Sequence, residues 1–238
     1  MRSPLNKRLF RELRGEFGKY LVIFILMTLT IGMVSGFLVA DGSMIQAYEE
    51  SFEKYSIENG HFRTEKKMNN AQIQDIEDLG IKLYENYYVE EALTNGSTMR
   101  IFKNRDEVNK VCLMKGKMPE KPGEIGIDRM YADNNDLSVG NEVESGGHTW
   151  KITGLVALSD YSALFSNNND SMFDSVKFGV SVVCPEEFDS YKADQLNYSY
   201  AWKYNTEPKN EKAEKDISED LMEDVAKEVT LEEFVPRY

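Results

Sequence analysis

The sequence predicts an α+β protein, with one amino-terminal transmembrane helix followed by a mixed α/β extracytoplasmic domain of one or two lobes. Two observations carry this prediction. The stretch 20–40 holds twenty-one residues without a charged side chain, and short segments of strand and helix pattern alternate from about residue 60 onward. A length of 238 residues allows one membrane span and one globular body of ordinary size.

The apolar stretch 20–40 has the length of a membrane-spanning helix. As a helix it would measure about 31 Å, close to the roughly 30 Å hydrocarbon core of a bilayer. A cleaved signal peptide usually has a shorter apolar region, and Leu38, two residues before Ala40, is too large for the usual cleavage site. A buried core helix seldom has so long an uncharged run. We therefore expect a span that is retained as an anchor.

Charge is distributed unequally on the two sides of this span. Residues 1–19 contain six Lys or Arg and two acids, whereas the whole chain has a net charge of −13, so the 198 residues after the span carry −17. A short basic flank marks the cytoplasmic side. We therefore expect a cell-membrane protein with its amino terminus in the cytoplasm and its main domain outside. The acidic balance of the main domain argues against nucleic acid as a partner.

Within the basic segment 1–19, residues 4–17 have the pattern of an amphipathic helix, and the alternative is a solvated basic tail. Basic residues surround an apolar stripe, and such a helix lies on the inner membrane surface in contact with lipid head groups. The stripe consists of four residues spaced four apart: Leu5, Leu9, Leu13 and Phe17.

A second helix is expected directly after the span. Ser43 and Gln46 fit a capping box, and apolar residues follow at helical spacing. This helix is either continuous with the span or begins again at Ser43, and we interpret it as a stalk. The expected division of the chain is a cytoplasmic segment at 1–19, the transmembrane helix at 20–40, the stalk at 41–58 and the α+β domain at 59–238.

Within the span, Gly32 and Gly36 form a GxxxG pair. Small residues at this spacing let two helix backbones approach closely in lipid, where packing drives association. We therefore predict that the span packs against another helix through these two glycines.

The outer domain is expected to alternate between strands and helices, with turns marked by Gly, Pro and Asn. The predicted strands are 60–64, 81–93, 98–104, 110–116, 124–127, 177–185 and 196–205, and the segments 137–143 and 150–156 are predicted to be turn-and-strand units. The predicted helices are 69–80, 128–134, 185–193 and 209–229, and a capping box at 230–233 predicts the start of one more.

The residues that usually carry chemistry form no reaction centre in this sequence. There is no phosphate-binding loop, no HExxH motif and no nucleophile elbow. His61 and His148 lack metal-ligand spacing and are better explained as surface or strand histidines. Cys112 and Cys184 lie in apolar strand patterns, where buried free thiols are expected. We therefore predict no catalytic residue, no cofactor, no metal site and no enzymatic activity.

Several short motifs occur in a characteristic order around this span and domain. Residues 11–44 form the span with its flanks, followed by Gly116-Lys-Met-Pro119, Pro122-Gly-Glu-Ile125, Leu137-Ser-Val-Gly-Asn-Glu-Val143 and Ile152-Thr-Gly-Leu-Val156. Together these resemble the amino terminus and periplasmic core domain of FtsX-like, MacB-type ABC transporter permeases. Lys117 and Asn141 depart from the usual Arg and Asp of that pattern without endangering the turns.

The resemblance implies a MacB-like periplasmic core fold and a transport role. Such permeases have no catalytic residues, and a separate cytoplasmic ABC ATPase drives them. The implied partners are membrane lipid, this ATPase, and further permease spans or a second permease copy. The family has further spans after the outer domain, whereas no second apolar run of that size occurs here. The resemblance therefore implies the amino-terminal portion of such a permease, apparently truncated. The alternative is a stand-alone single-pass protein that displays an extracellular binding or sensing module.

The charge asymmetry gives a first testable prediction, that residues beyond Asp41 lie outside the cytoplasm. Protease added to intact cells, or to spheroplasts if an outer membrane is present, is expected to digest the domain. Protection of residues 60–230 until the cells are lysed would show the opposite orientation.

Overall fold

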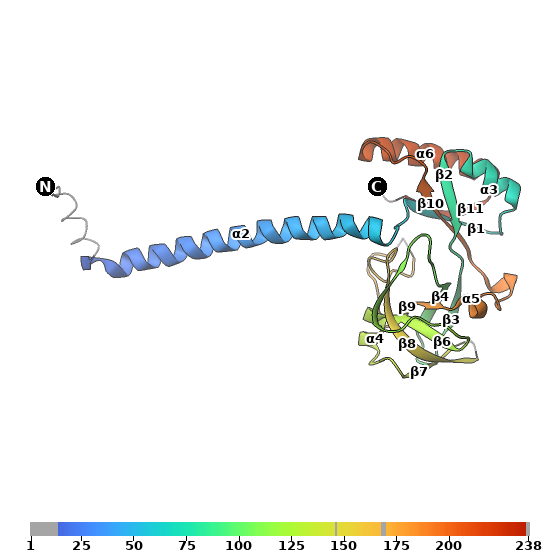
Figure 1. Cartoon of the computed structure of the whole chain (residues 1–238), viewed down its shortest axis with the longest axis horizontal. Coiled ribbons are helices and arrows are strands. Elements are labelled where there is room, and N and C mark those ends of the chain that lie inside the picture. The colour runs from blue at the N-terminus through green and yellow to red at the C-terminus, as the bar shows by residue number, and fades with distance from the viewer. Residues whose placement is uncertain (1–13, 146, 168–169, 237–238) are drawn as a thin grey trace. The chain divides into compact units, whose positions relative to one another are not determined.

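The computed structural model describes residues 14–145, 147–167 and 170–236. The described residues up to Glu50 form one compact unit, and those from Ser51 onward form a second. The second unit is a mixed domain of two β-sheets with short helices (Figure 1). The predicted fold class, one long apolar helix followed by an α+β domain, is therefore confirmed. The sequence left open whether the domain has one or two lobes, and it has two sheets, one in each lobe.

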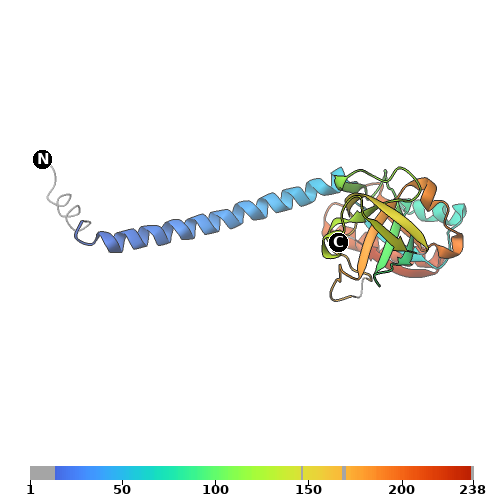
Figure 2. The same cartoon turned by 90° about the horizontal axis from the view of Figure 1, so that it is seen from below.

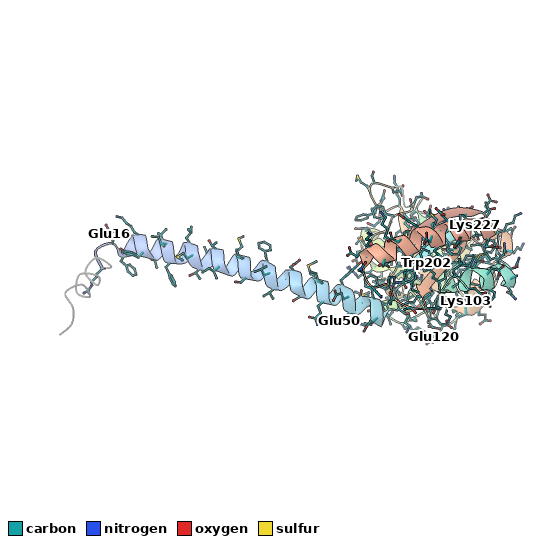
Figure 3. All side chains as sticks on the ribbon, turned by 90° about the horizontal axis from the view of Figure 1, so that it is seen from above. Glu16, Glu50, Lys103, Glu120, Trp202 and Lys227 are labelled. Atoms are coloured by element: carbon teal, nitrogen blue, oxygen red, sulfur yellow. The ribbon has the colours of Figure 1, made fainter. Side chains whose placement is uncertain are left out.

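The first element, α2 (Phe17–Lys54), is a single helix of 38 residues (Figure 2). By length and composition it can cross a membrane, and its most apolar stretch is not buried. Its side chains project on all sides between Glu16 and Glu50 (Figure 3). The hydroxyl groups of Thr28 and Thr30 donate to backbone carbonyls four residues earlier, each at 2.8 Å, so these polar groups are satisfied within the helix.

The helix passes through Ser43 without a new start, so span and stalk are continuous, which is one of the two alternatives that the sequence left open. Residues 41–54 extend about 21 Å beyond the predicted span. The predicted amphipathic helix at the amino terminus falls mostly on residues 1–13, which lie outside the described residues.

The four-stranded sheet is antiparallel, with the strand order β11-β1-β10-β2. Helices α3 and α6 lie together over one face of it (Figure 1). The bounds are β1 Gly60–Thr64, α3 Asn70–Glu77, β2 Ile81–Glu85, β10 Tyr198–Tyr204, α6 Glu211–Glu228 and β11 Leu231–Pro236.

Aromatic side chains form the core of this lobe. The Trp202 ring stacks on Phe234 with centroids 4.7 Å apart, and Phe62 stacks on Tyr200 at 5.6 Å. Gly60 lies directly beneath the Trp202 ring, where a Cβ atom would overlap the indole carbons. Glycine is therefore required where β1 begins.

The seven-stranded sheet is mixed, with the order β3-β4-β9-β6-β8-β5 and β7 paired to β8. The pairs β4–β9 and β6–β8 are parallel, and the others are antiparallel. The bounds are β3 Tyr88–Ala92, β4 Thr98–Lys103, β5 Val111–Gly116, β6 Glu124–Asp128, α4 Arg129–Asn134, β7 Glu142–Ser145, β8 His148–Leu158 and β9 Phe178–Val183. The short helices α5 (Pro185–Phe188) and η1 (Ala193–Gln195) lead back to β10.

Because β3 to β9 are consecutive, the seven-stranded sheet is inserted between β2 and β10 of the four-stranded sheet. The central strand β9 is buried along its whole length, as expected for a strand covered on both faces.

The motifs that carry the family resemblance meet around β8. Gly116 lies opposite Gly154, and the Lys117 amide donates to the Thr153 carbonyl at 2.9 Å. The Lys151 amide donates to the Gly123 carbonyl at 2.8 Å, and the Gly140 amide donates to Ile152 at 2.8 Å. These four motifs therefore build one part of the sheet and specify its fold.

Four sequence predictions were wrong in detail. The segment 81–93 is two strands, β2 and β3, in different sheets, because the Asn86 amide donates to the Ser199 carbonyl at 2.9 Å while its side chain accepts from Arg105. Residues 231–236 form a strand, not a helix start, because they pair with β1. Helix α5 ends at Phe188, well before residue 193. Cys112 is free but half-buried rather than buried, whereas Cys184 is free and buried.

The close backbone approach at Gly154 gives the second prediction. An added Cβ would lie 2.5 Å from the Lys117 carbonyl oxygen, and backbone cannot move aside cheaply. Gly154→Ala should destabilise the domain by about 1–3 kcal/mol, the usual cost of overpacking. Thermal unfolding of the detergent-solubilised chain, followed by tryptophan fluorescence, would measure this. Gly42→Ala is the control, because a Cβ atom added at Gly42 meets nothing within 4 Å. This variant should leave the midpoint temperature of unfolding unchanged.

Candidate functional site

The predicted helix-packing residues lie on one face of α2, one turn apart. A Cβ atom added to Gly32 or Gly36 would meet no described atom within 4 Å. The structure therefore leaves this face open, and its packing against another helix stays a prediction.

Within the second unit, the last turn of α2 and the segment after it, residues 51–61, form specific contacts with both sheets. The helix ends in a Schellman motif, with Ser56 in the left-handed region at φ 50°. The Ser56 amide donates to the backbone carbonyl of Glu53 at 3.2 Å, and the Ile57 amide donates to the backbone carbonyl of Phe52 at 3.0 Å. Because a non-glycine residue is disfavoured in this conformation, neighbouring contacts must hold it there.

Those contacts come from the loop 104–110 between β4 and β5. The Lys110 amide donates to the Tyr55 carbonyl at 2.8 Å, and the Asn109 amide donates to the Ser56 carbonyl at 3.1 Å. The Tyr55 hydroxyl also donates to the Cys112 Sγ atom at 3.0 Å. The segment after the helix is thus paired, backbone to backbone, with a loop of the seven-stranded sheet.

Asn109 and Glu58 hold the same segment through their side chains. Asn109 is fully buried, and its Oδ1 atom accepts from the Glu58 amide at 2.9 Å, while its Nδ2 group donates to the Glu58 carboxylate. The other Glu58 carboxylate oxygen lies 2.6 Å from His61 Nδ1. We call Glu58, His61 and Asn109 the junction clasp.

Both sheets are tied to this junction. Asn59 is fully buried and contacts two residues of β10. Its backbone amide donates to the Trp202 carbonyl at 2.9 Å, and its side-chain Oδ1 atom accepts from the Tyr204 backbone amide at 3.1 Å. On the other side, Arg105 of the loop 104–110 forms a bidentate ion pair with Asp160 at 2.7 and 2.8 Å. Their side chains are only 7 % and 6 % exposed, so this pair is buried and fixes the loop to the seven-stranded sheet.

A cavity of about 200 Å³ lies beside the clasp, between the two sheets. Arg63 of β1 donates to the Tyr88 hydroxyl of β3 at 2.6 Å and pairs with Glu233 at 2.9 Å. Arg100 of β4 lies over the Tyr88 ring at 4.4 Å. It also pairs with Glu90 at 2.6 Å and donates to the Tyr161 hydroxyl at 2.8 Å.

Each arginine of this cavity therefore has a carboxylate partner. Such a charge-balanced lining holds two sheets in register, whereas a site for a small anion would present unpaired cations.

His148, the other histidine of the sequence, begins β8 and lies 4.0 Å from Glu187. Cys184 is buried next to Pro185. In the described part of the chain, no group of three or more His, Cys, Asp or Glu could hold a metal ion.

Sequence reasoning did not find the junction clasp. Glu58 and His61 lie three residues apart, a spacing with no special meaning, and Asn109 is fifty-one residues away from Glu58. Serine is not a residue type from which the left-handed backbone of Ser56 could be predicted. Asparagine does favour turns, so Asn109 could have indicated a bend before β5.

No protein-family model matches this chain. No curated protein matches it either. Among solved structures, it is similar to the periplasmic region of MacB from Actinobacillus actinomycetemcomitans, at 12 % identity and a TM-score of 0.36, over 70 % of this chain and 83 % of that one. It is also similar to the extracellular domain of the noncanonical ABC-type transporter YknZ from Gram-positive bacteria, at 11 % identity and a TM-score of 0.36, over 67 % and 88 %.

The clasp gives the third prediction. Asn109→Gly keeps the left-handed backbone accessible at φ 49° but removes both side-chain contacts to Glu58. We expect faster hydrogen–deuterium exchange at residues 55–61. The free energy of unfolding should fall by about 1–3 kcal/mol, because the buried polar groups of Glu58 lose their partner.

The matched control is Asp136→Gly, because Asp136 has a similar φ of 54° and is exposed. This variant should leave exchange at 55–61 unchanged. Equal effects of the two substitutions would show that backbone freedom, and not the clasp, orders the junction.

Proposed function

We propose that this chain is the amino-terminal part of an ABC transporter permease, whose outer domain transmits or receives conformational signals driven by a separate cytoplasmic ATPase. The ordered motifs around β5 to β8, behind a span with a basic flank, support this assignment. In this proposal residues 1–19 are cytoplasmic and the domain is extracytoplasmic. The chain itself has no catalytic activity, and its membrane partners are lipid and further permease spans or a second copy.

The observation that carries the signalling role is the unbroken helix α2. A continuous helix transmits displacement along its length, whereas a Gly/Ser linker behaves as a random coil and absorbs it. A tethered binding module needs no rigid connection, and no hydrogen-bonded junction at its end. Here the helix continues into a segment that is paired with the loop 104–110 and with β10.

The route of the signal follows from the junction contacts. Any tilt or axial movement of residues 51–54 acts on the segment 55–59 through the helix-terminal hydrogen bonds. From there, the clasp and the Arg105–Asp160 ion pair lead to the seven-stranded sheet, and Asn59 leads to β10 of the four-stranded sheet. Both lobes are therefore coupled to the helix at one place.

The fourth prediction tests this coupling in the intact transport system. Inserting seven Gly/Ser residues after Gly42 should preserve membrane insertion and folding but uncouple the outer domain from the ATPase. The measurement is efflux or a resistance phenotype of the complete system, alongside ATP hydrolysis. Lost output with retained hydrolysis is expected.

The matched control is a seven-residue helical insert of Ala, Glu and Lys at the same position. Seven residues make close to two helical turns, so the helix keeps its rotational phase. This variant should retain most of the output. Full output with the Gly/Ser insert would instead identify the outer domain as a tethered binding or sensing module.

A further inference from the structure

The junction clasp contains a titratable group in contact with a buried carboxylate. His61 Nδ1 lies 2.6 Å from the Glu58 carboxylate, whose side chain is only 9 % exposed, and the imidazole is 28 % exposed. Among the described ion pairs, Glu58 takes part in one, the pair with His61. The neutralisation of this buried carboxylate therefore depends on the protonation of one imidazole.

Four other charged side chains line the cavity beside His61: Arg63, Arg100, Asp160 and Glu233. Asp160 follows β8 and is paired with Arg105, and Glu233 of β11 is paired with Arg63 of β1. Arg100 of β4 lines the same cavity and is paired with Glu90. Since these three arginines already have carboxylate partners, none is free to replace the His61 charge at Glu58.

Protonation of His61 is favoured in this setting. Burial opposes the charged imidazole and lowers its pKa. Attraction to the Glu58 carboxylate and the hydrogen bond that this carboxylate accepts from the imidazole, with smaller contributions from Asp160 and Glu233, raise the pKa above its ordinary value of 6.5. A group whose pKa is raised in the folded protein contributes stability that is fully present below the ordinary value. This contribution is lost as the pH rises through the raised value.

We propose that His61 is a positioning residue that makes the junction clasp sensitive to acidity. The clasp is tight while the imidazole is protonated, and it loosens when the imidazole is neutral. Loss of the charge leaves Glu58 buried with Asn109 and a neutral ring as partners, which weakens its hold on the segment after α2.

This inference deepens the proposed function, since it gives the connection between helix and outer domain a regulator. Its physiological reading rests on that function: with the domain outside the cell, the medium would set the stiffness of the connection. An acidic medium would favour a rigid connection between α2 and the outer domain, and an alkaline medium would favour a flexible one.

The test uses the full-length chain in detergent micelles and needs neither ATPase nor transport. Hydrogen–deuterium exchange is measured at residues 55–61 and 104–112 between pH 5.5 and 8.5, and it is corrected for the intrinsic pH dependence of amide exchange. We expect the corrected rates to rise severalfold with pH in the wild type. His61→Gln, which keeps a hydrogen-bonding side chain, should abolish the rise.

The matched control is His148→Gln, because the sequence contains only these two histidines. This variant should behave like the wild type. If His61→Gln fails to fold, Glu58→Gln, which removes the other charge of the pair, takes its place and should also abolish the rise. Absence of a pH-dependent rise in the wild type would overturn the proposal, as would an undiminished rise in a folded His61→Gln variant.

The outcome also separates this proposal from the proposed function. A pH-dependent clasp together with full output from the Gly/Ser insert would leave a pH-sensitive sensing module and reject mechanical coupling. A pH-independent clasp with lost output would retain mechanical coupling and reject its regulation by His61.

Discussion

The buried contact between Asn109 and Glu58 is the constraint on which the connection of α2 to the domain depends. One side chain holds both the backbone amide and the carboxylate of Glu58, so the segment after the helix has little freedom to move or rotate. Buried polar groups of this kind stabilise only when all their partners are present. Asn109 itself adopts a left-handed backbone, and Asn tolerates that conformation better than most residues do. The contact is therefore demanding in both residue type and geometry.

Much of the fold could be predicted because its signals are local. The helix α3 was predicted at 69–80, and its N-cap is Asn69, which forms a capping box with Gln72. The helix α4 was predicted at 128–134 and begins at Arg129, because the carboxylate of the N-cap residue Asp128 accepts from two amides of the first turn. Apolar length was enough to predict the part of α2 at 20–40. In each of these cases, residues within one or two turns of each other decide the outcome.

The errors and omissions arise where distant residues decide. The strand pattern of 81–93 gives no sign that the chain changes sheets at Asn86, because both halves are equally rich in strand-forming residues. The capping signature at 230–233 was overridden by pairing with β1 and by the stacking of Phe234 on Trp202. The junction clasp combines residues from two separate parts of the chain, so periodicity and spacing could not reveal it.

The insertion of one lobe within the other also has a consequence for how the chain is made. Strands β3 to β9 are contiguous in sequence, so the seven-stranded sheet can pair as soon as residues 88–183 have left the ribosome. Strands β1 and β2 must wait for β10 and β11, which are synthesised after the seven-stranded sheet, and their pairing closes a much longer loop. During synthesis, Phe62 and its neighbours therefore stay without their aromatic partners after α2 is complete. The four-stranded lobe therefore cannot complete its strand pairing until β11 has been synthesised, whereas all the strands of the seven-stranded sheet are available earlier.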